Sequence, residues 1–542
     1  MAYFSKEKFD STLSTGDQII ILAKPQIIKN MGNPFEFDYQ SMIQARNIWF
    51  SVYLTNGNYL KTWNKVNRII YLAEQVRDKL IFILTKVIRE KEERSVISAL
   101  TLGYRAEIGQ DTMDYFASTG AMHVLSVSGL HVGLIYYILG ILLSFLKRGK
   151  AGKAIFVCVL ILFLWIYDFI SGFSPSVQRA TVMFSFVIIG NGLRRPVNIY
   201  NTLMASALLL MLLNPDVIFD IGFQLSYLAV FGIILIQPAL YKLIEVTNPI
   251  IKWIWSLTTV SIAAQLTTFP LGLFYFNQFP NLFWLSNFIV IPATTLIIWL
   301  TLVFFSVCSI QSLAFVLGFV IEKITHWMLV VLKFLDSLPY AVSQGIVLSH
   351  TQVFMLFSGI ITIILFFTSK RKGWILSFLV VVLLFQMSGF YEKSKVFNQR
   401  EIIIYNSKSM MIHLINGRTN YLITNDVRSL SENEISTFEK VRYHLKLSPT
   451  QIISLDQSGK GEYGDLVINK NQLKFINATL SSGSVYEMKK ISELITLNIQ
   501  ATDSDTATIE RKIYTGNSGL FGESKSEYFC TKLSGAFLCQ IK

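Results

Sequence analysis

The sequence predicts a polytopic α-helical membrane protein with about ten transmembrane helices, flanked by two soluble ends. Its 542 residues are 52% hydrophobic and 15% charged, with a mean hydropathy of +0.47. A soluble chain of this length usually carries about 25% charged residues. Residues 121–390 contain only 14 basic and 6 acidic side chains. Within that region, apolar runs of about 17–25 residues recur, which is the length that crosses a bilayer as a helix.

Ten of these runs are predicted spans. They lie near 123–146, 154–171, 177–193, 198–214, 221–238, 252–272, 282–305, 312–335, 350–369 and 373–390. The fifth and sixth are interrupted by Gln and Pro, and a broken helix is tolerated in a membrane only where protein or a water-filled cavity covers its freed backbone. The predicted organisation is a partial barrel-like region at 1–58, a helical, partly amphipathic connector at 59–120, the membrane domain at 121–390 and a β-rich domain at 391–542.

Basic residues in the short loops predict the orientation. They cluster at 147–153, 194–195, 242–252 and 370–372, whereas the alternate loops 171–176, 215–220, 275–281 and 339–349 have almost none. The positive-inside rule places the basic loops in the cytoplasm, so both soluble ends face outward. No signal peptide or earlier span precedes residue 120, and we therefore expect that membrane helices ahead of residue 1 are missing from this chain.

The two ends contain strand-like segments. Gln18–Leu22 and Ile48–Leu54 are compatible with part of a small β-barrel. Residues 60–95 predict a helix with one basic face, for which a bilayer-surface position is favoured over nucleic-acid contact. The tail contains strand-like runs and little predicted helix. These runs are 401–405, 411–414, 421–423, 451–455, 465–469 and 495–499.

The tail offers no evident metal site. Its two histidines, His413 and His444, are far apart, and a binuclear centre needs several closely spaced His and Asp ligands. We therefore expect no metal, no cofactor and no nuclease activity. Cys158 and Cys308 lie in apolar segments and are interpreted as packing residues. The spacing of Cys530 and Cys539 does not decide whether they form a disulfide.

The most informative stretch is 119–133, where polar and small residues stand at the start of the first span. The candidates are His123, Ser126, Ser128, Gly129 and His131. Polar side chains at membrane depth are costly and mark either a transport pathway or a packed polar knot between helices. Ser128 and Gly129 are small enough for another backbone to approach closely. The sequence leaves both interpretations open.

Further candidates lie in later spans. Arg179 stands at the outer entrance of the third span, where it either meets an anionic substrate or extends its side chain to the bilayer interface. Asp168, at the end of the preceding span, is the predicted structural partner of Arg179. Neutral polar residues either line a lumen or form interhelical hydrogen bonds. These are Gln224, Ser226, Gln265 and Asn287.

Several motifs together resemble the ComEC competence-protein family. They are Leu-Gly-Tyr-Arg (102–105), Thr-Gly-Ala-Met-His-Val-Leu-Ser-Val-Ser-Gly-Leu-His (119–131), Ser-Pro-Ser-Val-Gln-Arg-Ala (174–180), Asp-Ile-Gly-Phe-Gln-Leu-Ser-Tyr-Leu-Ala (220–229), Gln-Leu-Thr-Thr-Phe-Pro-Leu (265–271) and Ser-Asn-Phe-Ile-Val-Ile-Pro (286–292). The resemblance covers about residues 15–390. It implies an inner-membrane channel that imports single-stranded DNA in natural transformation, with an exported OB-like barrel ahead of the membrane domain.

This chain departs from the family pattern in two ways. It lacks the membrane helices that usually precede the OB-like barrel, and its tail lacks the metal ligands of the metallo-β-lactamase-like domain that many members carry. No nucleotide-binding loop is present, so transport requires a separate cytoplasmic motor ATPase or capture of the strand inside the cell. The resemblance also implies a periplasmic DNA-binding protein as a partner, and it leaves homo-oligomerisation open.

Two other functions compete with the channel. A secondary transporter or flippase for small anions or lipid head groups would use the same broken helices and buried polar groups. A membrane-embedded hydrolase built on His123, Ser128 and His131 ranks last, because no acidic residue in the motif would orient a histidine.

Overall fold

The computed structural model describes most of the chain. The described residues are 2–4, 17–44, 47–54, 59–64, 68–125, 129–147, 149–193, 197–407, 409, 411–424, 430–454, 462–469, 472–479, 488–490, 494–502, 506–514, 525–530 and 537–540. They form two compact units. One comprises residues 9–22 and 56–382 and contains the membrane helices, and the other comprises residues 1–8, 23–55 and 383–542. The predicted domain boundaries remain predictions.

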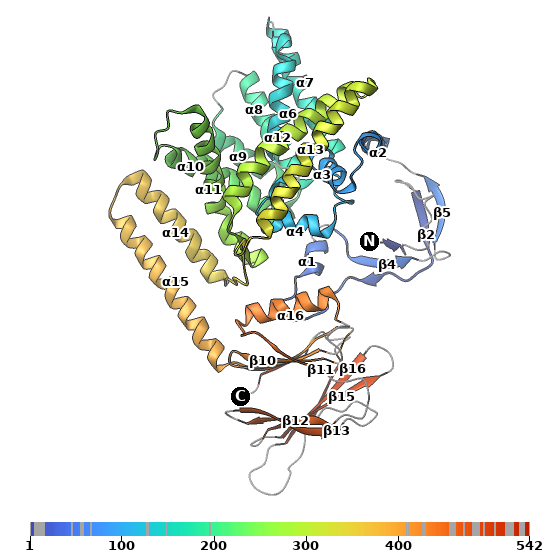
Figure 1. Ribbon diagram of the computed structural model, residues 1–542, viewed down its shortest axis with the longest axis vertical. Helices are drawn as coiled ribbons and strands as arrows, with labels where there is room; N and C mark the ends of the chain where they lie inside the picture. Colours follow the sequence, from blue (N-terminus) through green and yellow to red (C-terminus); the bar gives the residue numbers. More distant parts are fainter. Residues whose placement is uncertain are drawn as a thin grey trace. The chain divides into compact units, whose positions relative to one another are not determined.

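Helices dominate the first unit (Figure 1). After the paired strands β2 (Asp17–Ile21) and β5 (Tyr59–Asn64) come the connector helices α2 (Arg68–Val87), α3 (Lys91–Leu102), α4 (Gln110–Ser118) and α5 (Met122–Leu125). The body follows with α6 (Gly129–Leu142), η2 (Ser144–Lys147), α7 (Gly149–Ile170), α8 (Pro175–Gly192), α9 (Ile199–Leu213), η3 (Pro215–Phe219), α10 (Ile221–Tyr241), α11 (Pro249–Phe276), β6 (Gln278–Pro280), α12 (Phe283–Val307), α13 (Gln311–Asp336), β7 (Val342–Gln344), α14 (His350–Ser369) and α15 (Gly373–Asn398).

This fold confirms a multi-pass α-helical membrane protein. Each of the ten predicted spans overlaps one of the helices α6 to α15. Among the described residues, seven helices are long and apolar enough to cross a membrane, namely α7 and α10 to α15. The helices α6 and α9 are apolar but shorter, and α8 has 18 residues. The prolines inside α10, α11 and α12 are accommodated without ending the helix.

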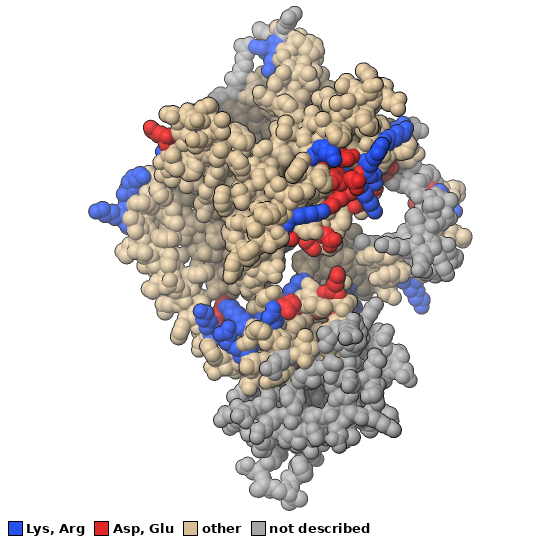
Figure 2. All heavy atoms as spheres, viewed as in Figure 1, with Lys and Arg blue, Asp and Glu red and all other residues tan. Residues whose placement is uncertain are grey.

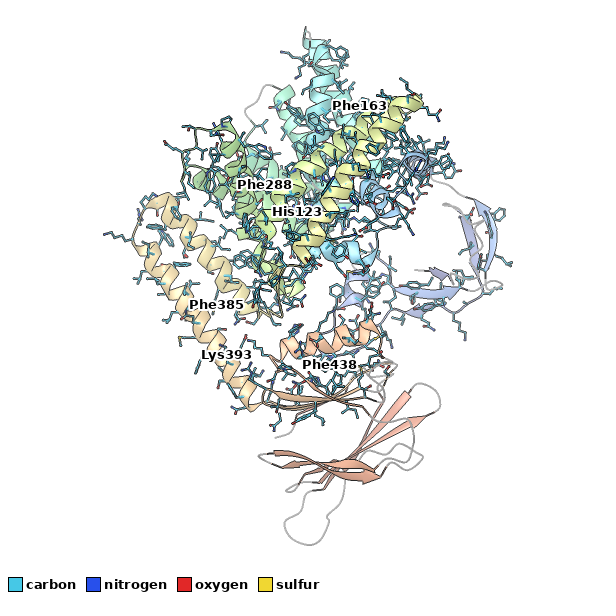
Figure 3. The ribbon with its side chains drawn as sticks, in the orientation of Figure 1. His123, Phe163, Phe288, Phe385, Lys393 and Phe438 are labelled. Carbon is cyan, nitrogen blue, oxygen red and sulfur yellow. The ribbon has the colours of Figure 1, made fainter. Side chains whose placement is uncertain are left out.

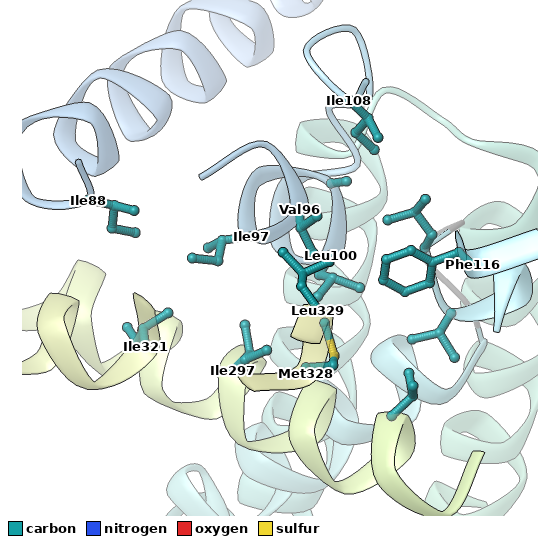
Figure 4. Close-up of a cluster of buried hydrophobic side chains, with 14 of the residues drawn as sticks. Ile88, Val96, Ile97, Leu100, Ile108, Phe116, Ile297, Ile321, Met328 and Leu329 are labelled. Carbon is teal, nitrogen blue, oxygen red and sulfur yellow. The ribbon is translucent and has the colours of Figure 1, made fainter. Parts of the chain in front are cut away.

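The connector helices pack into the membrane body through a large apolar core (Figure 4). Ile97 and Leu100 of α3 are fully buried, as are Ile297 of α12 and Ile321 of α13. Gly318 of α13 makes room for the side chain of Val87, because a Cβ atom there would collide with it. The connector is therefore a structural part of the membrane unit.

Polar contacts reinforce the same interface. His326 Nδ1 of α13 lies 2.9 Å from Glu93 Oε1 of α3, and Lys333 Nζ lies 2.9 Å from Glu92 Oε2. The Oε2 atom of Glu322 accepts a hydrogen bond from the backbone N–H of Arg89 at 3.1 Å. Figure 2 shows charged side chains gathered over this part of the body, whereas much of the surrounding surface is uncharged. These contacts explain why a membrane-length helix carries several charged residues on one face.

Two loops with few basic residues are joined by a small sheet. β6 pairs antiparallel with β7, and Asn281 Nδ2 donates hydrogen bonds to Tyr340 O at 2.7 Å and Ser343 Oγ at 2.9 Å. The ends of α11 and α13 therefore lie on one side of the bundle. This agrees with the prediction that the loops 275–281 and 339–349 share a side of the membrane.

The second unit combines chain segments that are far apart in sequence. Its first part holds β1 (Ala2–Phe4), β3 (Gln26–Ile27), α1 (Tyr39–Gln44) and β4 (Phe50–Leu54), with strand order β1-β4-β3. Its second part holds β8 (Arg400–Ile404), β9 (Met411–Asn416), β10 (Thr419–Thr424), α16 (Glu432–His444), β11 (Gln451–Ser454) and β18 (Phe537–Gln540), which form a sheet of order β11-β10-β9-β8-β18 covered by α16. Further strands are β12 (Glu462–Asn469), β13 (Gln472–Thr479), β14 (Met488–Lys490), β15 (Leu494–Thr502), β16 (Thr506–Tyr514) and β17 (Lys525–Cys530).

The early and late segments of this unit are connected by a reciprocal amide contact. The side chain of Asn33 donates to Asn406 O at 3.2 Å and accepts from Asn406 N at 2.8 Å. The side chain of Asn406 donates to Met31 O at 2.8 Å, and the ring of Phe35 stacks on His444 at 4.5 Å. Residues near 30 and residues beyond 400 therefore belong on the same side of the membrane.

The structure adds one helix to the tail and places His413 in its core. The helix α16 was not predicted, although Ser431 and Glu434 form the capping box that announces it. Phe438 of α16 packs on the sheet against Tyr405 and His413 (Figure 3). His413 is a buried core histidine, since Tyr405 Oη lies 3.0 Å from its Nδ1 and Asn420 Oδ1 lies 3.2 Å from its Nε2.

We predict that replacing Gly232 with Ala destabilises the body by roughly 1–3 kcal/mol through overpacking. A Cβ atom at Gly232 of α10 would collide with Thr267 Oγ1 and lie 2.7 Å from Ala263 O of α11. The same contact includes a hydrogen bond from Thr267 Oγ1 to Leu228 O at 2.8 Å. Thermal unfolding of the detergent-purified protein measures the effect. The matched control is Gly272→Ala in α11, where a Cβ meets nothing within 4 Å. Equal melting temperatures for the two variants would contradict this packing.

We also predict a pH dependence for the second unit. Burial lowers the pKa of His413 to about 4, below its unfolded value of about 6.5. A base with a lowered folded pKa contributes stability above the unfolded pKa and loses it as pH falls through the window from 6.5 to 4. At pH 5.5 the loss is roughly 1 kcal/mol relative to pH 7.5. Urea unfolding of the full-length protein, followed by limited proteolysis of the tail, should show it. His413→Gln, which cannot titrate, should show a much smaller loss.

Candidate functional site

A polar site lies where α8, α9, η3 and α10 meet. An apolar cluster holds these elements together, with buried Val182 from α8, Leu210 from α9 and Phe223 from α10. Pro175 occupies the first turn of α8, where its missing N–H costs nothing. Asn214 caps η3 by accepting from Asp216 N at 3.2 Å. The start of α8 and the start of α10 are thereby fixed next to each other.

Arg179 is the central residue of this site. Its side chain is only 5% exposed, and its nearest acidic group is Asp220, with 3.9 Å between Nη1 and Oδ1. That separation exceeds hydrogen-bonding distance, and neither Nη1 nor Nε has a hydrogen-bond partner among the described residues. A buried guanidinium that is neutralised but lacks acceptors for its N–H groups is unusual, because unmet charged donors cost free energy.

Asp220 has a second role in the same place. Its Oδ1 atom accepts a hydrogen bond from Phe223 N at 2.7 Å, so it caps the first turn of α10. Its side chain is 35% exposed, far more than that of Arg179. The sequence signal for Asp220 was its capping position. Sequence reasoning did not connect it with Arg179, because the contact depends on how α8 and α10 pack.

The structure gives Arg179 a different partner from the one we predicted. Asp168 lies near the end of α7, fully buried, and neither of its carboxylate oxygens has a hydrogen-bond partner among the described residues. Its backbone carbonyl accepts hydrogen bonds from Ser171 Oγ at 2.8 Å and from Phe173 N at 3.0 Å. The ion pair of Arg179 is therefore with Asp220 instead of Asp168, since η3 brings Asp220 to the start of α8.

Gln224 belongs to the same site and is a bridge between elements. Its Nε2 atom donates to Ile218 O of η3 at 2.8 Å, and its Oε1 atom accepts from Tyr275 Oη of α11 at 3.1 Å. Next to it, Tyr227 Oη lies 3.0 Å from Ser206 Oγ of α9. Sequence reasoning did not identify Ser206 or Tyr275, which become recognisable only when the helices are assembled.

The remaining polar candidates occupy other helix contacts. Asn287 of α12 is buried, with Nδ2 3.5 Å from Ser261 Oγ of α11, so it makes an interhelical contact. Ser226 and Gln265 are half-buried on α10 and α11. The structure thus brings Gln224 together with Arg179 and Asp220, and it places Asn287 in a separate pair.

The motif 119–133 is a packing junction where the structure describes it. His123 of α5 has Nδ1 3.1 Å from Gly120 O (Figure 3), and His131 of α6 is fully buried. A Cβ added to Gly129 would make an ordinary van der Waals contact with Ala180 Cβ of α8 at 3.5 Å, so the predicted close backbone approach is not required at this glycine. Thr119 O accepts from Ser286 Oγ at 2.6 Å. Ser126 and Ser128 lie outside the described residues.

The arrangement presents a buried guanidinium whose Nη1 and Nε have no acceptor among the described residues. A buried guanidinium with free N–H groups suits an oxyanion such as a phosphate. Within the described part of the chain, no group of three or more His, Cys, Asp or Glu side chains could hold a metal ion. The cysteines whose side chains are described, Cys158 and Cys308, are free thiols.

Comparison with known proteins identifies the family. A family model described as "Competence protein" matches residues 100–372, which is half of the chain and includes every element of this site. The chain belongs to the ComEC/Rec2 competence-protein family. The resemblance inferred from the sequence motifs is confirmed, and the protein is a multi-pass membrane member of a family implicated in DNA uptake during transformation.

Individual relatives support this assignment. ComE operon protein 3 of Bacillus subtilis is 27% identical over 262 residues, covering 48% of this chain and 32% of the relative. Recombination protein 2 of Haemophilus influenzae is 28% identical over 212 residues, covering 37% and 26%. An uncharacterized protein of Aquifex aeolicus is 27% identical over 207 residues, covering 38% and 46%. The match thus spans less than half of each relative's length. No solved structure matches the chain.

We predict energetic coupling between Arg179 and Asp220 but not between Arg179 and Asp168. In double-mutant cycles on thermal stability, Arg179→Gln with Asp220→Asn should show a coupling of about 0.5 kcal/mol, modest because Asp220 is partly exposed. Arg179→Gln with Asp168→Asn should be additive. Asp216→Asn, a charge change at the nearby exposed end of η3, serves as the control. Coupling to Asp168 alone would restore the original pairing.

Proposed function

We propose that this competence-family protein is a channel in the bacterial cytoplasmic membrane that admits single-stranded DNA during natural transformation. Family membership and the membrane helices support the setting. The observation that carries the proposal is Arg179, a buried cation with unmet hydrogen-bond donors at one end of the helical body. A DNA strand brings one negative charge per nucleotide, so its path must offset that charge without holding the strand tightly.

The proposed orientation has both soluble ends outside the cell. The basic clusters 147–153, 242–252 and 370–372 would then face the cytoplasm. The contact between Asn33 and Asn406 supports a shared side for the two ends. Arg179 and Asp220 lie next to the loops 171–176 and 215–220, which have no basic residues, so the site would stand at the outer mouth.

The proposed partners would supply the energy for transport and deliver DNA to the outer face of the membrane. The protein would work in the lipid bilayer with a separate cytoplasmic motor ATPase and a periplasmic DNA-binding protein, and as a homo-oligomer if one copy is too narrow. We also propose that the tail is not a nuclease, because its two histidines, His413 and His444, are far apart in the sequence. A transporter or flippase for small anions is the second candidate, because the same guanidinium would bind a single phosphate head group.

We expect the charge of Arg179 to matter more than its shape. Arg179→Lys should retain part of the uptake, whereas Arg179→Gln should reduce transformation by about tenfold or more at equal protein level in the membrane. The measurement is the transfer of fluorescent DNA into the cytoplasm together with transformant counts.

A control and a rival outcome make this test decisive. Asp216→Asn should transform normally. Normal transformation by a stably expressed Arg179→Gln protein would remove Arg179 from the DNA path. If Arg179→Gln abolished the flux of small anions into liposomes but left DNA uptake unchanged, the transporter would be favoured.

A further inference from the structure

We propose that the amino-terminal end of α10 and the guanidinium of Arg179 together form a binding site for one phosphodiester group, with Asp220 as a built-in competing carboxylate. The ligand class is a monoanionic phosphate diester, and its assignment to the DNA backbone rests on the proposed function. The competing carboxylate would keep the site from holding the backbone too strongly.

The guanidinium of Arg179 has hydrogen-bond donors without an acceptor among the described residues. Arg179 Nη1 and Nε are buried and lack acceptors among the described residues, although the side chain is about 95% removed from solvent. In a folded protein such donors are nearly always satisfied. An oxyanion that enters beside Asp220 would supply the missing acceptors, and the charge-assisted hydrogen bonds it forms are stronger than neutral ones.

The amino-terminal end of α10 is a second feature that attracts anions. α10 has 21 residues and begins at Ile221, so the first N–H groups of the helix have no partner within it. Asp220 Oδ1 satisfies only the N–H of Phe223, at 2.7 Å. A helix amino terminus attracts anions through these N–H groups and its dipole. Arg179 adds a full positive charge at the same point, which a bare helix end lacks.

Gly222 lies beside both charged groups. A Cβ atom at Gly222 would lie 3.0 Å from Asp220 Oδ1 and 3.8 Å from Arg179 Nη1. Even a methyl group here would press on Asp220 Oδ1, so glycine keeps the approach to both charged groups free of a side chain. Gly222 is exposed, and the side chain of Asp220 is 35% exposed, so this approach is open to the outside. Arg179 itself remains sheltered behind them.

The carboxylate of Asp220 competes with an arriving phosphate for Arg179. Asp220 Oδ1 is 3.9 Å from Nη1, close enough to offset the charge of Arg179 but too far to satisfy its donors. An arriving phosphate gains hydrogen bonds that Asp220 does not make, yet it is repelled by the Asp220 carboxylate. Conduction requires such a balance, because a site that binds too strongly does not release its ion. Asp220 therefore limits affinity and speeds release.

The test uses the purified full-length protein in nanodiscs and a fluorescent oligothymidylate, with dimethyl phosphate as a second probe. Asp220→Asn preserves the helix cap, because Asn caps as well as Asp, but removes the competing charge. It should raise the affinity for both probes by about threefold to fivefold. Asp216→Asn removes the same charge nearby and should change affinity less than about twofold. Arg179→Gln should weaken binding, and the double variant Arg179→Gln/Asp220→Asn should show no gain.

A second variant tests the space itself. Gly222→Ala should lower the affinity for dimethyl phosphate, whereas Gly272→Ala should not, and equal melting temperatures of the two variants would show that the loss does not come from a disturbed helix cap. Equal affinities for Asp220→Asn and Asp216→Asn, or a gain that persists without Arg179, would overturn the site even if DNA uptake is normal. A gain for dimethyl phosphate without oligothymidylate binding would keep the site and refute the DNA channel.

Discussion

A polar group placed among apolar helices must find its partner within the protein, and this constraint shapes the whole membrane unit. Thr267 reaches a backbone carbonyl of α10 only because Gly232 lets the two helices touch. Ser286 reaches Thr119 O, and Glu93 of α3 reaches His326 of α13. Each of these contacts fixes a helix crossing. Arg179 and Asp168 are exceptions, since each is buried with charged-group atoms that have no hydrogen-bond partner among the described residues.

The sequence predicted the parts of this fold that depend on local pattern. Apolar runs located α6 to α15. Basic residues separated the loops into two sets, and the pairing of β6 with β7 brings together two loops of the set that lacks basic residues. Motif order gave the family. The helix α16 could have been predicted from its capping box at Ser431 and Glu434, but the strand runs around it favoured a β-rich domain with little helix.

The site was predicted only in part, for a physical reason. Arg179 and Gln224 were identified because polar residues are rare in apolar runs. Their partners were not, because Asp220, Tyr275 and Ser206 meet them only through helix packing between distant segments. Proximity along the chain suggested Asp168 for Arg179. The α7–α8 turn instead directs the two side chains to different neighbours, and hydrophobic periodicity contains no information about that choice.

The reciprocal contact between Asn33 and Asn406 has a consequence for how the protein is made. Its two halves are separated in the chain by every helix of the membrane body. The second unit cannot close until the last of those helices has been inserted. If one helix failed to insert, the number of crossings would become odd, and the halves would lie on opposite faces of the bilayer. The second unit therefore closes only when the helices between its two halves have been inserted so that both halves lie on one face of the bilayer.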